Sequence, residues 1–237
     1  MNVAIRTLAL SASLLAPAWA GAQSDHDPSG HWSGAIHAPS GDVAVAVDLV
    51  IDGGKLTGTF SNPGEQIKGF PLATATQSGQ ALKLALKIGN DGQAFDGSLS
   101  ADGRSLAGDF LISVYAVPFT LERTGDAQIA APPVNAAIDE RLAGEWSSEL
   151  KVGPSSLAVA LTLANGGDGT ASGAWASSGG TMTPVTIEFR DGRVTLASTV
   201  MPATYSGTLS ADGREIAGVF KEGAAEQPMT FRRAPRR

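Results

Sequence analysis

Histidine is the side chain best suited to acid–base or metal chemistry near neutral pH, and this chain has three: His26, His31 and His37. Asp25, Asp27, His26 and His31 are the residue types that bind Zn or Cu. His31 and His37 would share one strand face, but their spacing corresponds to roughly 20 Å along a strand. One ion could not join these two histidines, and we interpret the group from Asp25 to His31 as an exposed terminus with incidental histidines. We therefore predict neither a metal site nor a cofactor.

Nucleophilic chemistry has no recognisable motif in this chain. An α/β-hydrolase needs Gly-x-Ser-x-Gly between a strand and a helix, and Gly169-Thr-Ala-Ser-Gly173 has the wrong spacing for it. No calcium loop or phosphate-binding glycine loop occurs either. The aspartates stand mostly in turns, where the side chain bonds its own backbone: Asp52, Asp91, Asp102, Asp168, Asp191 and Asp212. We therefore predict that the protein is not an enzyme.

Residues 1–22 are typical of a secretory signal peptide. Arg6 supplies a positive start, an apolar run covers Leu8 to Ala16, and small residues place cleavage after Ala22 or after Ala20. The apolar run is too short to span about 30 Å of hydrocarbon, and no cysteine follows it to carry a lipid. We expect a periplasmic or secreted bacterial protein without a transmembrane anchor.

The composition limits both partners and sources of stability. The formal net charge is −6, the sequence pI is near 5.0 and charged residues make up 17% of the chain, which argues against nucleic acid as a partner. The C-terminal arginines, from Arg232 to Arg237, are expected to form a solvated tail. With no cysteine in the chain, stability must come from core burial and sheet closure rather than disulfides.

The chain contains an internal duplication. Gly97–Phe110 recurs as Gly207–Phe220, 110 residues later, and Pro118–Arg123 recurs as Pro228–Arg233 at the same offset. Two further blocks repeat in order, Gly30-His-Trp32 as Gly144-Glu-Trp146 and Thr57–Phe60 as Ser172–Trp175. We predict a first β-barrel module at 23–124, a Pro/Ala-rich linker at 125–140 and a second module with a basic tail at 141–237. Asp139 is expected to cap a single helical turn before the second copy.

Each copy has the pattern of a β meander. Leu82, Leu84 and Leu86 alternate with polar or small residues, as on a half-buried strand, and Asp191-Gly192 predicts a type I′ hairpin. In the first copy, about eight short strands are expected around Trp32, Val47, Thr57, Pro71, Leu84, Gly97, Gly108 and Leu121. The predicted fold is all-β, with two tandem small antiparallel meander barrels of about eight strands each.

Three strands of each copy have the form Gly-x-large, as in Gly97/Leu99 and Gly207/Leu209. Alternation places both residues of such a pair on the inner face. The glycines would allow the sharp coiling that barrel closure needs, which is the interpretation we favour. Alternatively, they leave room for a ligand.

The paired Gly-x-Trp and late arginine resemble the ends of lipocalin- and avidin-like (calycin) barrels. Those families begin with Gly-x-Trp on the first strand and carry an arginine on the last. The resemblance implies a structural latch in which Arg123 lies across Trp32 and Arg233 lies across Trp146.

A second resemblance spans nearly a whole copy. The sequence Gly30-His-Trp-Ser-Gly34, the strand at Thr57–Phe60, Gly69-Phe-Pro-Leu72 and the final Pro118–Arg123 resemble an accessory β domain that precedes the catalytic domain of exported bacterial α/β-hydrolases. The second copy lacks a sequence counterpart of Gly69–Leu72, and no hydrolase follows. The resemblance implies an accessory role rather than hydrolysis.

Two binding functions remain open from the sequence, and an enzyme with a site that no motif reveals is the third alternative. The first is binding of a small apolar ligand by the inner face of the first barrel, with these candidate residues: Val45, Val47, Phe60, Leu84, Leu86, Phe95, Leu99 and Phe110. The second is an interaction module that binds an exported protein or a polymer through its outer surface, as a hydrolase accessory or a protease inhibitor would. Tandem sites would raise the avidity of such a module.

Overall fold

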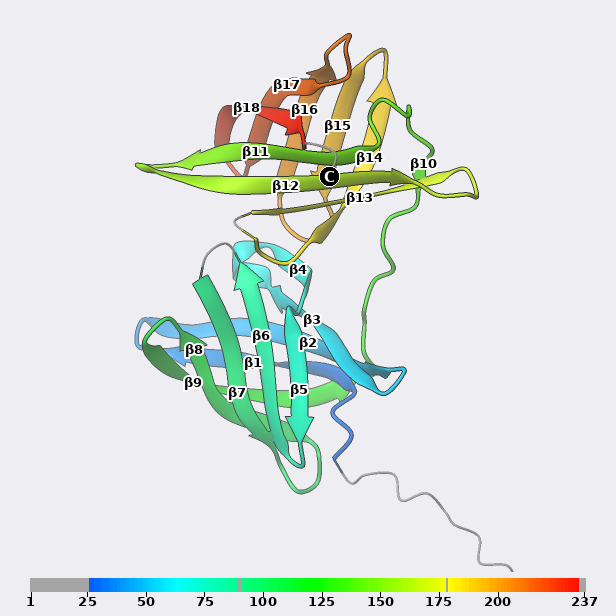
Figure 1. The fold of residues 1–237 in the computed structure, drawn as a ribbon. Helices are drawn as coiled ribbons and strands as arrows, with labels where there is room; N and C mark the ends of the chain where they lie inside the picture. The colour runs from blue at the N-terminus through cyan, green and yellow to red at the C-terminus, as the bar shows by residue number, and fades with distance from the viewer. Residues whose placement is uncertain (1–25, 89–90, 178, 235–237) are drawn as a thin grey trace, which may run out of the picture.

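The computed structural model describes residues 26–88, 91–177 and 179–234. The strands form two antiparallel meander sheets that follow one another along the chain (Figure 1). We call them the first module (β1–β9) and the second module (β10–β18). The predicted signal peptide and the last three residues lie outside the described residues.

The first module contains β1 (Gly30–Ala38), β2 (Gly41–Asp52), β3 (Lys55–Asn62), a 3₁₀ turn (Pro63–Glu65), β4 (Ile67–Pro71), β5 (Thr74–Ser78), β6 (Ala81–Ile88), β7 (Asp91–Leu99), β8 (Ser105–Ile112) and β9 (Tyr115–Gly125). The second contains β10 (Asn135–Ala136), β11 (Gly144–Val152), β12 (Ser155–Asn165), β13 (Thr170–Ser177), β14 (Thr183–Arg190), β15 (Arg193–Ser198), β16 (Ala203–Leu209), β17 (Glu215–Glu222) and β18 (Ala225–Arg233). In both modules the first long strand pairs with the last, β1 with β9 and β11 with β18, which curls the sheet into a barrel.

The two barrels close differently. In the second, β13 pairs with β14 and completes an eight-stranded ring. In the first, no ladder joins the edge strands β4 and β5. The chain itself connects them at a corner, where the Leu72 N–H donates to Gly58 of β3 and the Ala73 N–H donates to Ala85 of β6. Two consecutive backbone N–H groups therefore bond to β3 and β6, the strands on the two sides of the gap in the sheet.

This corner changes the predicted strand count. The single strand expected around Pro71 is split into β4 and β5, because the chain turns after Pro71, a residue that has no N–H for a ladder. The structure also supplies the counterpart that the second copy lacks in sequence. Pro184 pairs with Ala174 as Pro71 pairs with Thr59, so β14 is the unbroken equivalent of β4 and β5.

Alternating side chains fill the interior of the first module, as the period-two pattern predicts. Leu82, Leu84 and Leu86 are buried, whereas Lys83 between the first two is exposed. Lys83 Nζ lies 3.6 Å from Asp96 Oδ2 on the neighbouring strand β7. Burying a large aliphatic side chain stabilises a fold by about 1.5–3 kcal/mol. In the absence of disulfides, this burial is the main stabilising term.

The inner glycines accommodate the protein's own atoms. A Cβ on Gly218 would lie 2.2 Å from the Ser206 carbonyl oxygen and 2.5 Å from Gly207 Cα, so the paired glycines bring β16 and β17 close together. A Cβ on Gly97 would meet the Phe119 ring at 2.8 Å, and one on Gly207 would meet the Tyr205 hydroxyl at 2.6 Å. The space at these glycines is therefore used for strand coiling and ring packing rather than for a ligand.

The Trp/Arg stacking implied by the lipocalin-like pattern is present in both modules. Arg123 Cζ lies 4.7 Å from the ring centroid of Trp32, and Arg233 Cζ lies 4.4 Å from that of Trp146. Each indole N–H donates to a backbone carbonyl four residues earlier, Pro28 and Leu142 respectively. Each latch closes one end of its barrel.

The segment between the modules has two structurally different parts. At its start, the Gln128 N–H donates to the buried Asp48 carboxylate of β2 at 2.7 Å. From Asn135 onward the chain belongs to the second module, because Ile138 and Leu142 lie in that module's core. The predicted turn at Asp139 is present, with its carboxylate accepting from the Arg141 N–H.

Asn135 links three strands through its side chain. Its amide donates to the carbonyls of Ala171 on β13 and Val185 on β14, and its side-chain oxygen accepts from the Ile187 N–H at 2.8 Å. The residue is 6% exposed. β13 and β14 diverge beyond their short ladder, and the Asn135 side chain lies between them at this place. Asn135 therefore pairs backbone N–H and C=O groups that would otherwise need a direct ladder between the two strands.

Replacing Asn135 by alanine is expected to lower the free energy of unfolding of the second module by about 1–3 kcal/mol, because buried backbone groups lose their partners. Chemical denaturation followed by tryptophan fluorescence measures the loss. Val134→Ala, at the adjacent and 85% exposed position, is the control and should change the stability by less than about 0.5 kcal/mol. Equal effects of the two substitutions would contradict the bridging role.

The modules meet at the ends opposite their latches. The Lys68 N–H, at the start of β4, donates to the Val200 carbonyl at 2.9 Å, and the Thr181 N–H donates to the Lys87 carbonyl at the end of β6. Val200, from the loop between β15 and β16, is 4% exposed and belongs to the core of the first module. The second module therefore contributes a side chain to the first barrel, and Figure 1 shows β4 beneath the lower ends of β13 and β14.

Candidate functional site

Two of the three histidines that could do chemistry, His31 and His37, have structural partners. His31 Nδ1 lies 2.7 Å from Asp48 Oδ1, and His37 contacts both the Asp42 carboxylate and the Thr120 hydroxyl. No cluster of three or more metal-ligating side chains occurs among the described residues. Asp25, one member of the predicted ligand set, lies outside them. His31 and His37 are therefore part of hydrogen-bonded pairs on the surface of the first module, whereas His26 Nδ1 is buried and has no partner in the part of the chain that the structure describes.

The duplicated Ser-Ala-Asp-Gly-Arg turns bind their own backbone. The Ser100 hydroxyl donates to Asp102 at 2.6 Å, and Ser210 makes the same bond to Asp212. The hydroxyl and the following arginine N–H hold the pKa of each aspartate below its usual value. A carboxylate stabilised in its ionised form by its own turn is a poor proton donor, so these repeated residues form hairpins rather than a catalytic pair.

The eight candidate ligand residues of the first module do come together, but they pack against one another. All of them are buried in a single hydrophobic core. The Phe95 ring lies at its centre, with centroid distances of 5.9 Å to Phe60, 4.6 Å to Phe110 and 4.9 Å to Phe119. These rings occupy the middle of the barrel, where the sequence placed a ligand. The residues are core residues, and the predicted binding site has to be sought elsewhere.

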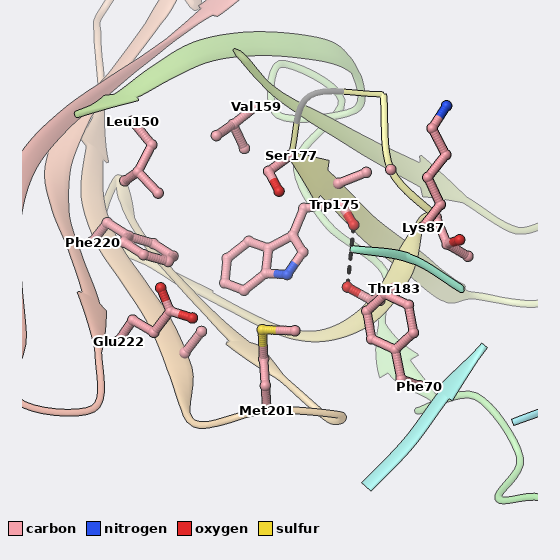
Figure 2. Close-up of a pocket in the computed structure, with 14 residues that line it drawn as sticks. Phe70, Lys87, Leu150, Val159, Trp175, Ser177, Thr183, Met201, Phe220 and Glu222 are labelled. Carbon is pink, nitrogen blue, oxygen red and sulfur yellow. Dashed lines mark hydrogen bonds between the residues drawn. The ribbon is translucent and has the colours of Figure 1, made fainter. Parts of the chain in front are cut away.

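A cavity lies instead at the junction of the modules, in the end of the second barrel that faces the first (Figure 2). We call it the junction pocket. Its larger apolar walls are Phe70 from the first module and Leu150, Val159, Trp175, Met201 and Phe220 from the second. The cavity measures about 90 Å³, and one water needs roughly 10–15 Å³. The pocket has room for a compact group of several non-hydrogen atoms.

The pocket also contains a buried hydroxyl without a hydrogen-bond partner. Trp175 is 6% exposed, and its backbone carbonyl accepts from Thr183 Oγ1 at 3.2 Å. The buried hydroxyl of Thr181 has no partner among the described residues. Buried donors are nearly always satisfied in folded proteins. An apolar cavity with a few unsatisfied polar groups is the typical composition of a ligand site.

Ring packing explains why the cavity is in the second module. Tyr205 stands where the first module has Phe95, but its hydroxyl donates to the carbonyls of Ile216 and Met229. Burial raises the pKa of the Tyr205 hydroxyl well above its ordinary value, so the hydroxyl stays protonated and keeps these bonds. The Tyr205 ring packs on Phe231, with 5.0 Å between the ring centroids, whereas Trp175 packs on Phe220. The centre of the second barrel is therefore less crowded at the end that faces the first module.

Sequence reasoning did not identify the junction pocket. Trp175 was visible as the large member of a Gly-x-large pair, at the position of Phe60 in the first copy. Its role depends on Phe70 and Lys87, which reach the pocket from the other module. The one signal in the sequence is this difference between the copies, tryptophan in place of phenylalanine.

No family model matches this chain, and no curated protein matches it. Among the described residues, no helix is long and apolar enough to cross a membrane. The chain has a low similarity to some solved structures. A putative outer membrane protein from Bacteroides fragilis is 15% identical, covers 86% of this chain and 95% of its own, and has a TM-score of 0.25.

Two further solved structures are similar at the same level. A protein of unknown function from the DUF3598 family of Nostoc punctiforme is 13% identical over 87% of this chain and 96% of its own, with a TM-score of 0.27. The transferrin binding protein B of Neisseria meningitidis is 11% identical over 84% of this chain and 68% of its own, with a TM-score of 0.23. Similarities this low assign neither a family nor a function, so the all-β, two-barrel architecture rests on the strand pairing described above.

Proposed function

We propose that this protein is an exported, non-catalytic binding protein that holds a compact, largely apolar group of a small molecule in the junction pocket. The observation that carries the proposal is the buried Thr181 hydroxyl, which has no hydrogen-bond partner among the described residues and lies in a cavity with apolar walls that include Trp175. The apolar walls would supply most of the affinity, and the indole and the Thr181 hydroxyl would orient a hydrogen-bond acceptor. The histidine and aspartate contacts described above support a role without catalysis.

A filling substitution tests this proposal. Ala203 is 3% exposed and lines the cavity, so Ala203→Leu should occupy the space and weaken binding by about tenfold or more. Trp175→Phe keeps an aromatic wall but removes the donor, and should cost roughly three- to tenfold for ligands with an acceptor. Calorimetric titration with a panel of small amphiphiles measures both effects.

Ala217→Leu is the matched control, because this alanine of the same module is exposed on β17. Affinity unchanged from the wild type is expected for it. The proposal is wrong if Ala203→Leu binds the panel as tightly as the wild type does, or if the wild type binds no member of the panel.

A second function is favoured by the hairpin between β8 and β9. Its tip exposes Val114 (87%) and Tyr115 (71%), and Ser113 adopts a positive φ of 54°, where the second copy has Gly223. A non-glycine residue in this conformation next to exposed apolar side chains departs from ordinary turn chemistry. The hairpin tip therefore supports a second function, in which the protein is an interaction module. Such a module would bind an exported protein or a polymer, as a hydrolase accessory or a protease inhibitor does.

The hairpin gives this second function its own test. The double variant Val114→Ser/Tyr115→Ser should lose capture of periplasmic partners in a pull-down while keeping its unfolding transition. Capture that is equal for wild type and variant would exclude the hairpin as the contact.

A further inference from the structure

The charged residues of the junction pocket lie on different sides of it. Two charged residues are among those that line it, Lys87 and Glu222. In Figure 2 the carboxylate of Glu222 faces the rings of Trp175 and Phe220, whereas the Lys87 side chain extends away from them. The ammonium of Lys87 lies beside the loop at Gly179. The charge next to the aromatic walls is therefore negative.

Glu222 has no ion-pair partner among the described residues. The neighbouring Lys221, on the opposite face of β17, pairs with Glu226 at 2.8 Å. Glu222 is exposed at the rim of the pocket, where its carboxylate can face the charge of a bound ligand. The net charge of −6 adds a long-range attraction for cations.

The aromatic walls suit the same kind of ligand. The rings of Trp175 and Phe220 form a corner, with centroids 5.9 Å apart and planes at 67°. The face of an aromatic ring carries partial negative charge and attracts a cation within about 6 Å, and tryptophan does so most strongly. A charge held in such a corner can contact both rings while the methyl groups around it fill apolar space.

Resting on the proposed function of this pocket, we infer that its ligand carries a compact organic ammonium group. The rings of Trp175 and Phe220 contact the substituents on the nitrogen, and the Glu222 carboxylate faces its charge. The small volume of the cavity suits a methylated ammonium group, and the rest of the ligand would extend through the rim toward solvent. A free metal ion would find one carboxylate there and no further charged ligand facing it.

A comparison of isosteric probes tests the inference. Choline, its neutral isostere 3,3-dimethyl-1-butanol and the anion 3,3-dimethylbutanoate have similar shapes and differ in charge. Calorimetric titration of the full chain should give choline about tenfold tighter binding than the neutral isostere. Glu222→Gln should remove most of that difference, and Trp175→Leu should weaken choline binding by a similar factor.

Two further variants make the outcomes specific. Glu188→Gln, the control, removes an exposed carboxylate from β14 of the same module and should leave choline binding unchanged. Lys87→Met removes the positive charge that lines the pocket and should strengthen choline binding. The inference is wrong if choline and the neutral isostere bind with equal affinity. It is also wrong if the anion binds more tightly than choline and Lys87→Met abolishes this binding. In both cases the proposed pocket would still stand. Binding of no probe of any charge would overturn the proposed function as well.

Discussion

Replacement of Trp146 by alanine is expected to lower the free energy of unfolding of the second module by about 3–5 kcal/mol. The side chain is 1% exposed, so its removal leaves a large cavity at the latch. It also removes the ring beneath Arg233, whose guanidinium donates to the carbonyls of Ala143 and Gly213. An arginine stacked on a ring is held in place for such bonds, and without the ring it becomes mobile.

Trp146→Phe separates packing from hydrogen bonding. This variant keeps a ring under Arg233 but loses the N–H that donates to Leu142, so we expect a smaller loss of about 1–3 kcal/mol. Denaturation followed by circular dichroism and by the remaining tryptophans measures both variants. Trp32→Ala should give the same pattern in the first module, because its latch repeats the geometry. A loss below about 1 kcal/mol for Trp146→Ala would show that the latch does not hold the barrel.

Phe95→Ala is expected to have an effect of similar size in the first module. Its ring contacts three other phenylalanine rings, and loss of a buried phenylalanine costs about 3–5 kcal/mol, part of which comes from the cavity left behind. That cavity would be apolar and therefore dry. The variant should gain stability from a small apolar compound such as benzene, because a ligand that binds only the folded state raises its stability.

The wild type provides the comparison for this test. Thermal unfolding with and without benzene should show a ligand-induced shift for Phe95→Ala that the wild-type first module lacks. Phe95→Leu, which leaves a smaller space, should give an intermediate loss of stability and a weaker shift. A shift of equal size in the wild type would mean that the first barrel has a ligand space of its own, and that its eight inner residues form a binding site.

The sequence by itself was sufficient for the features that depend on local pattern and on repetition. Period-two alternation reveals which side chains of β6 face inward, and Asp191 and Gly192 both have the positive φ of the predicted hairpin. The recurrence of Gly-x-Trp and a late arginine indicated both latches. These features could be predicted because each depends on neighbours along one strand, or on two strands whose pairing the meander order already implies.

The junction pocket depends on contacts that no such pattern contains. Alternation shows that Phe95 and Tyr205 face inward, but it cannot show that one ring fills the centre of its barrel while the other is drawn aside by its hydroxyl. The strand split after Pro71 and the insertion of Asn135 between β13 and β14 likewise depend on where backbone groups find partners across the fold.

The tertiary structure alone decided how the modules meet. Phe70 and Lys87 reach the cavity of the second module, and Val200 enters the core of the first, although these residues are far apart in the chain. The duplication follows from repeated blocks, the strands follow from local alternation, and the latches follow from motifs at the two ends of each copy, so the sequence determined all three. The pocket follows from the shapes of two barrel ends placed against each other, and side-chain packing between non-adjacent elements has no period along the chain from which it could be predicted.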